Sequence, residues 1–168
     1  MHVDELLQKC NETHVIFDSS VILDYVRLSG RAQDRRLEIL SYIMNNCRNK
    51  AISWLNLEEI LVGGMENKEE IEGFILYSFE IADITRAEVE VAAELEAEMR
   101  KRGLRLKGEN WRIDLFIAAF AYTKSYYIFT KDSESYYIFT KDSDFKKILR
   151  CKEIDVEGNV YYLCGRWN

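Results

Sequence analysis

Short apolar runs alternate with helical patterns along this chain, and this alternation limits the possible folds more than any other feature. Runs rich in aromatic and β-branched residues predict strands at 14–17, 51–55, 79–84, 126–130, 136–140 and 159–164. Apolar residues at helical spacing predict helices between them at 4–10, 21–26, 34–46, 56–64, 68–78, 85–102, 111–124 and 144–149. We therefore expect a three-layer α/β/α domain with a mostly parallel central sheet.

The length and composition fit one globular domain. A chain of 168 residues with 48% apolar content can bury a core, so we expect a single domain over 1–168, with 1–13 as an N-terminal helical extension. No apolar run reaches the length that spans a bilayer, and the acidic N-terminus is unlike a signal peptide. We expect a cytoplasmic protein with no membrane partner. The net charge of −6 argues against a basic coat for nucleic acid.

The four cysteines are scattered and form no C-x-x-C pair. This spacing makes a structural zinc site a poor interpretation. We expect buried or half-buried free thiols, because free cysteine usually behaves as a small core residue.

Several carboxylates fall where chemistry is expected in an α/β protein. Asp18 follows the first predicted strand, and Asp132 and Asp142 each follow a copy of Tyr-Tyr-Ile-Phe-Thr. Sites in parallel sheets lie at the carboxyl ends of strands. Asp114 lies within an apolar helical pattern, where an acid is costly to bury without a partner.

A divalent cation would explain why such acids converge. Glu58 and Glu59 are adjacent on a predicted helix, so only one of them can face inward. Converging carboxylates repel one another by about 4 kcal/mol per pair at intermediate dielectric. Mg²⁺ or Mn²⁺ removes this conflict and can also activate water toward a phosphodiester. The sequence has no Gly-rich phosphate loop with its lysine, so nucleoside triphosphate chemistry is not indicated.

Four segments, taken in order, resemble the PIN domain and most closely the small VapC-type toxin ribonucleases. They are FDSSVILD at 17–24, SWLNLEEILVG at 53–63, DLFIAAFA at 114–121 and TKDSDF at 140–145. Each motif is short, but the order holds from residue 15 to about 160. The register of the second motif selects Glu59 over Glu58.

The resemblance implies a Mg²⁺- or Mn²⁺-dependent ribonuclease that cleaves single-stranded RNA. Such a protein is often a homodimer and is held inactive by an antitoxin protein. The implied metal-binding and catalytic residues are Asp18, Glu59, Asp114 and Asp142. The implied supporting residues are Ser20, Asp24, Asp132 and Asp144.

The fourth motif occurs twice within residues 125–144, because a segment of ten residues is duplicated in tandem. The family's usual spacing from Asp114 leads to Thr130 in the first copy. The Asp-Phe that usually follows the motif, Asp144 and Phe145, belongs to the second copy. Only one copy can lie beside the first strand. We expect the second, because Asp142, Asp144 and the following helix stay in register.

A basic run before Asp114 could guide RNA phosphates, through Arg102, Arg105, Lys107 and Arg112. The alternative is a solvated helix end whose cations suit the helix dipole. Trp111 could stack a base, or lie in a core or dimer interface.

Other functions stay open. One is a PIN-domain RNA-processing factor, and another is a catalytically weak PIN-like module that binds RNA or protein. A receiver-like signalling domain would need an acidic pair after the first strand, where only Asp18 stands. A haloacid-dehalogenase phosphatase needs Asp-x-Asp, and the chain has Asp18-Ser19-Ser20.

Overall fold

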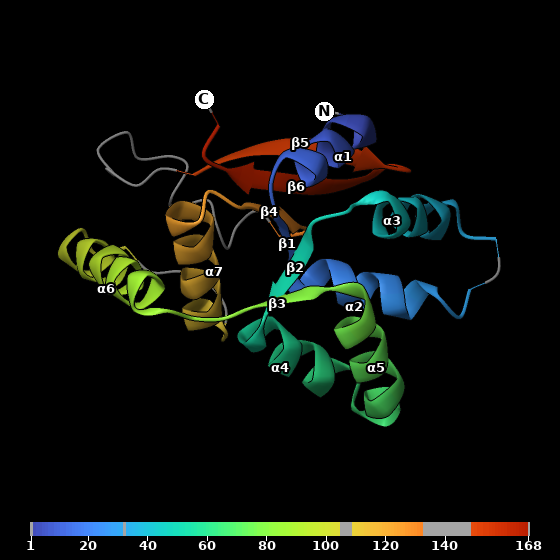
Figure 1. Cartoon of the computed structure of the whole chain (residues 1–168), viewed down its shortest axis with the longest axis horizontal. Coiled ribbons are helices and arrows are strands. Elements are labelled where there is room, and N and C mark those ends of the chain that lie inside the picture. The colour runs from blue at the N-terminus through green and yellow to red at the C-terminus, as the bar shows by residue number, and fades with distance from the viewer. Residues whose placement is uncertain (1, 32, 105–108, 133–148, 168) are drawn as a thin grey trace.

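The computed structural model describes residues 2–31, 33–104, 109–132 and 149–167, and within them the chain forms seven α-helices and six strands (Figure 1). In chain order these are α1 (Val3–Glu12), β1 (Val15–Phe17), α2 (Ser19–Leu28), α3 (Arg35–Asn46), β2 (Lys50–Ser53), α4 (Trp54–Gly63), the 3-10 turn η1 (Met65–Asn67), α5 (Lys68–Ser78), β3 (Glu80–Ala82), α6 (Arg86–Lys101), α7 (Trp111–Thr123), β4 (Tyr127–Thr130), β5 (Arg150–Val156) and β6 (Asn159–Gly165).

One mixed sheet runs through the molecule in the order β3-β2-β1-β4-β6-β5. The first four strands are parallel, and β6 and β5 continue the sheet as an antiparallel pair. The α/β class and the mostly parallel central sheet are therefore confirmed. Because β1 is central, its carboxyl end lies between those of β2 and β4, which is where parallel sheets carry their sites.

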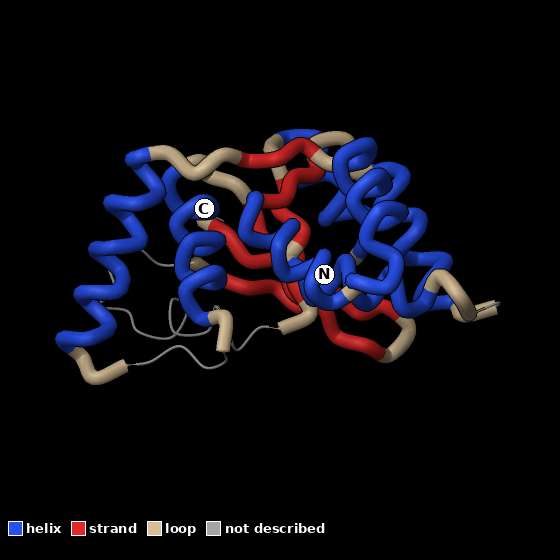
Figure 2. Tube along the Cα trace, turned by 90° about the horizontal axis from the view of Figure 1, so that it is seen from below, coloured by secondary structure: helices blue, strands red, loops and turns tan. Residues whose placement is uncertain are grey.

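Helices cover both faces of this sheet. In β1, Val15 and Phe17 pack into a core with α1 to α5, whereas Ile16 packs into a second core with α6 and α7. This alternation follows from the two-residue period of a strand. Figure 2 shows the strands between the two groups of helices. All three residues of β1 are fully buried, as expected for a strand covered on both faces.

The edge strand β5 was not predicted from the sequence. Its residues are mostly charged or polar, and only Ile154 and Val156 are buried. It forms because every residue from Arg150 to Val156 pairs with β6. The helix expected at 144–149 falls mostly outside the described residues.

The strand beside β1 is built from the first copy of the duplicated segment, and this corrects the expectation that the second copy lies there. Tyr127 pairs with Val15, and Phe129 with Phe17. Tyr127 follows closely on the end of α7 at Thr123, so the first copy reaches the sheet through a short link. Asp142 and Asp144 lie outside the described residues.

The cysteines are paired, so the expectation of free thiols is wrong. Cys10 of α1 is bonded to Cys47, which ends α3, and Cys151 is bonded to Cys164 across β5 and β6. Sequence spacing could not show this, because the partners meet only through the fold. None of the described helices has both the length and the apolar character needed to cross a membrane.

Candidate functional site

Asp18 lies where β1 ends and α2 begins, as the residue before the first turn of the helix. Its amide donates to the carbonyl of Phe129 (2.9 Å), which ties it to β4. The hydroxyl groups of Thr130 and Ser20 donate to Asp18 Oδ2, at 2.8 and 3.0 Å. The first and fourth sequence motifs therefore meet at one carboxylate, and the meeting copy is the first one.

Glu59 approaches the same place from α4. Ser19 Oγ donates to Glu59 Oε1 (3.1 Å), and Asn110 Nδ2 donates to Glu59 Oε2 (2.9 Å). Asn56 Nδ2 in turn donates to Ser19 Oγ (3.2 Å). Glu58 is exposed. The helix thus presents Glu59 toward Asp18, which is the orientation expected from the sequence.

The two acids are held in an environment that disfavours their charges. Burial raises the pKa of Asp18, the nearby charge of Asp132 raises it further, and the hydroxyl donors only partly offset this. Burial also raises the pKa of Glu59, as does the charge of Asp18. A positive charge near both carboxylates would stabilise their ionised forms.

Two further expected acids are connected to this pair, Asp132 through its charge on Asp18 and Asp114 through Asn110. Asp132 lies two residues after the end of β4, and its amide donates to Thr130 Oγ1 (3.0 Å). Asp114 is half-buried in the first turn of α7, and its amide donates to the carbonyl of Asn110 (3.3 Å). It therefore lies one helical turn from the residue that contacts Glu59.

The carboxylate groups at this site are suitable ligands for a divalent metal ion. Carboxylate oxygens are the ligands that Mg²⁺ and Mn²⁺ prefer, and two of the four expected acids are brought together here. Within the described residues, no group of three or more histidine, cysteine, aspartate or glutamate side chains is close enough to hold an ion.

Asp24 belongs to a different cluster. It is buried, and it accepts hydrogen bonds from Lys131 Nζ (3.1 Å, to Oδ1) and from the Tyr161 hydroxyl (to Oδ2). Arg36 Nη1 lies 3.7 Å from Oδ2. Burial raises the pKa of Asp24, but Tyr161, Lys131 and Arg36 together hold it below its ordinary value. The supporting acid expected from the sequence is thus one member of an ion-paired network.

Sequence reasoning missed the partners of Asp24. Lys131 stands inside the Thr-Lys-Asp unit, which was the available signal. No sequence signal pointed to Arg36 or Tyr161, because the contacts between α3, α2 and β6 depend on tertiary packing.

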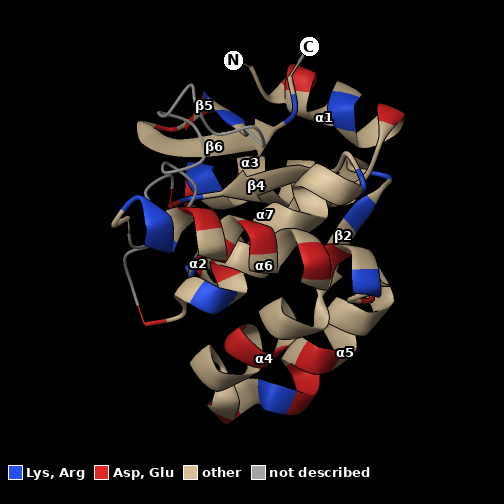
Figure 3. Cartoon of the chain, turned by 90° about the vertical axis from the view of Figure 1, so that its left-hand side faces the viewer, with Lys and Arg blue, Asp and Glu red and all other residues tan. Residues whose placement is uncertain are grey.

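Most residues of the basic run that lie within the described part of the chain are paired with glutamates. Arg102 binds Glu98 (2.8 Å), and Arg112 lies 3.7 Å from Glu96 and over the ring of Trp111. Figure 3 shows the acidic positions that line α6. Arg105 and Lys107 lie outside the described residues, so their expected role stays a prediction.

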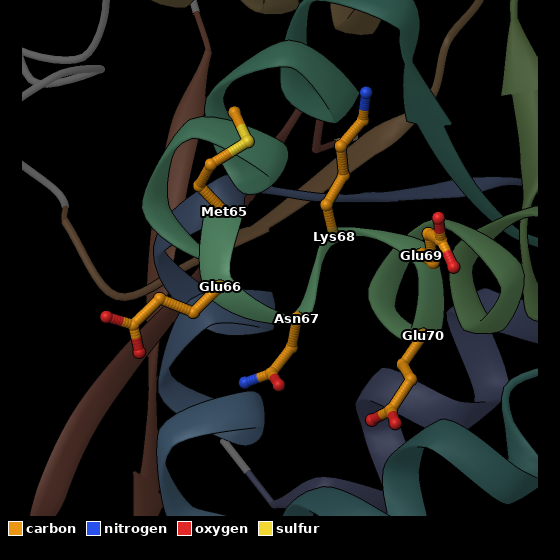
Figure 4. Close-up of a pocket in the computed structure, with 6 residues that line it drawn as sticks. All are labelled: Met65, Glu66, Asn67, Lys68, Glu69 and Glu70. Atoms are coloured by element: carbon orange, nitrogen blue, oxygen red, sulfur yellow. The ribbon is translucent and has the colours of Figure 1, made fainter.

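A shallow pocket at the corner between α4 and α5 does not contain the acid pair. Its lining consists of six consecutive residues, Met65, Glu66, Asn67, Lys68, Glu69 and Glu70. Their side chains point in different directions (Figure 4). This pocket therefore offers no converging polar groups to a ligand.

No protein-family model matches this chain, and no curated protein matches its sequence.

Proposed function

We propose that this protein is a Mg²⁺- or Mn²⁺-dependent endoribonuclease that cleaves phosphodiester bonds of single-stranded RNA. The observation that carries the proposal is the pairing of buried Asp18 with half-buried Glu59 at the carboxyl end of β1. These acids lie 41 positions apart in sequence (59 − 18). Burial raises the pKa of both carboxyl groups, and the charge of Asp18 raises the pKa of Glu59 further. Such a pair suits a site that works with a bound cation.

The residues that would hold the cation are Asp18, Glu59, Asp114 and the aspartate of the fourth motif. We assign the last position to Asp132 in place of Asp142, because its charge acts on Asp18 and its strand lies beside β1. A bound Mg²⁺ or Mn²⁺ supplies activated water and neutralises developing charge on the phosphate.

The neighbouring hydroxyl and amide groups fix where the carboxylate oxygens point. Thr130 and Ser20 both donate to Oδ2 of Asp18, which fixes the orientation of its carboxylate. Ser19 and Asn110 take one oxygen each of Glu59. Such orientation of ligating groups raises metal affinity and activity by about 10- to 100-fold in metalloenzymes.

The finer parts of the proposal rest on the resemblance of the four ordered motifs. On this basis we propose a PIN-like domain, the role of toxin in a toxin–antitoxin pair, an antitoxin protein as partner, a homodimer and a cytoplasmic location. The sheet order and the two helical layers are compatible with that fold.

The test is cleavage of a labelled single-stranded RNA with Mn²⁺, with and without EDTA. Asp18→Asn, Asp114→Asn and Glu59→Gln should each lower the rate by more than about 100-fold, the upper range for loss of an outer partner of a metal. Glu58→Gln is the matched control, because Glu58 is the exposed neighbour of Glu59, and it should cleave like the wild type. Equal cleavage by Asp18→Asn would overturn the proposal.

Metal binding is measured separately by thermal unfolding. Mn²⁺ at 100 times its dissociation constant adds about 2.7 kcal/mol, which corresponds to about 5–10 °C for a chain of this size. Asp18→Asn should lose this shift. A shift that is unchanged in the variant would place the ion elsewhere.

A further inference from the structure

The cluster around Asp24 carries an excess positive charge. One carboxylate, Asp24, is bound by two cations, Lys131 and Arg36, and by the neutral hydroxyl of Tyr161. Arg36 also donates to Asn159 Oδ1 (3.2 Å). Summing the formal charges, one negative and two positive, leaves one positive charge on the cluster.

Lys131 is the member that presents this charge to solvent. Its side chain is 39% exposed, against 17% for Arg36 and 11% for Asp24. An ammonium group has three N–H donors, and Asp24 accepts one of them (3.1 Å). Lys131 therefore keeps donor capacity for a further anion, whereas Arg36 is engaged in holding α3 against α2 and β6.

The same lysine is linked to the acid pair through its backbone. Its amide donates to Ser20 Oγ (3.1 Å), and Ser20 Oγ donates to Asp18. The ammonium, in contrast, is held at Asp24, six residues beyond Asp18, or about 9 Å along the axis of α2. A cation held at Asp24 can contact a phosphate that lies further along the same strand than the one at the acid pair.

We propose that the Lys131 ammonium binds a backbone phosphate of single-stranded RNA, next to the phosphate held at the acid pair. Asp24 and Tyr161 are positioning residues that hold this ammonium in place. The inference rests on the proposed function for the identity of the strand. It adds a binding contact that the acid residues cannot supply, because an acidic site repels a polyanion.

Holding the lysine in advance favours binding. A free lysine loses side-chain entropy when it contacts a phosphate, and a side chain that is already ordered loses less. The buried carboxylate of Asp24 orders Lys131 in this way. It does not cancel the charge, because Arg36 balances Asp24.

The experiment measures binding without cleavage. A short fluorescein-labelled oligouridylate is titrated with protein in EDTA, and its anisotropy is followed at several salt concentrations. Lys131→Gln should weaken binding about fivefold, the upper range for one exposed charge pair. The slope of log K against log salt should fall in magnitude by about 0.7, the value for one phosphate contact on a single strand.

Two controls separate a phosphate contact from general damage. Lys141→Gln changes the same residue of the second copy and should keep the wild-type slope. Lys131→Arg keeps the charge and should also keep the slope.

The outcomes distinguish this inference from the nuclease proposal. An unchanged slope in Lys131→Gln, an equal loss in Lys141→Gln, or absence of RNA binding by the wild type would overturn the phosphate contact, whether or not RNA is cleaved. A reduced slope in Lys131→Gln alone supports it. It would do so even if the wild type failed to cleave with Mn²⁺.

Discussion

Replacing Tyr161 by phenylalanine should destabilise the protein through one lost hydrogen bond. Tyr161 is fully buried in β6, its ring packs against Phe129 at a centroid distance of 5.6 Å, and its hydroxyl donates to Asp24. Burial and the charge of Asp24 raise the pKa of Tyr161, so the hydroxyl stays protonated as a donor. Phenylalanine keeps the ring contacts and removes only this donor.

The expected cost follows from the acceptor. A hydrogen bond to a charged group contributes about 1.5–3 kcal/mol, and water cannot easily replace the hydroxyl because the Asp24 side chain is only 11% exposed. Lys131 and Arg36 still pair with the carboxylate. We therefore expect a loss of about 2 kcal/mol in the free energy of unfolding. With a urea m-value of about 2 kcal/mol per molar, the midpoint should fall by about 1 M.

The assay is equilibrium unfolding in urea at neutral pH, with both disulfides kept oxidised. Tyr162→Phe is the matched control, because Tyr162 is the next residue of β6 and packs on the opposite face of the sheet. It should change the midpoint by much less. Equal midpoints for Tyr161→Phe and the wild type would refute the contribution of the hydroxyl to stability.

The pH dependence of the free energy of unfolding is a second test of the hydrogen bond between Tyr161 and Asp24. The folded pKa of Asp24 lies below its ordinary value of 3.8, since its three partners outweigh the effect of burial. A depressed carboxyl pKa stabilises the fold above the ordinary value, and this stability is lost as the pH falls through the folded pKa. The difference between wild type and Tyr161→Phe should therefore be full at neutral pH and shrink in acid. A difference that grows in acid would contradict the assignment.

Two further predictions concern the duplication and the disulfides. Asp132→Ala should lower Mn²⁺-dependent RNA cleavage far more than Asp142→Ala, because the first copy lies beside β1; a larger loss for Asp142→Ala would contradict this. Replacing Cys10 and Cys47 together by serine should lower the free energy of unfolding by about 4 kcal/mol, since the bond closes a loop with a sequence separation of 37. Urea unfolding of the double serine variant beside the wild type, both without reductant, checks this, and midpoints that do not differ would count against it.

Local patterns predicted the central part of the fold. The apolar run before Asp18 and the helical spacing after it are short-range features, and they produced β1 and α2 where expected. The edge strand β5 escaped prediction because its residues are mainly charged. Its pairing with β6 supplies hydrogen bonds that no hydrophobic pattern indicates.

The choice between the two copies could not be made from the sequence. Ser125–Ser133 and Ser135–Ser143 are identical, so both copies have the same strand propensity. The position of α7 decides between them, because its end lies close before Tyr127. The role of Asp24 was hidden for a similar reason, since its partners come from three separate elements.

The position of Asp18 has a consequence for motion in the site. Its amide is bonded to β4, and it directly follows a strand buried on both faces. Amides in such a strand exchange with solvent only when most of the domain opens. Glu59 is half-buried, and Asn110, which precedes α7, is exposed, so smaller openings are enough at these two positions. The Asp18 side of the site is therefore fixed for as long as the protein is folded. The side formed by Glu59 and Asn110 is the one that can move when a strand of nucleic acid enters.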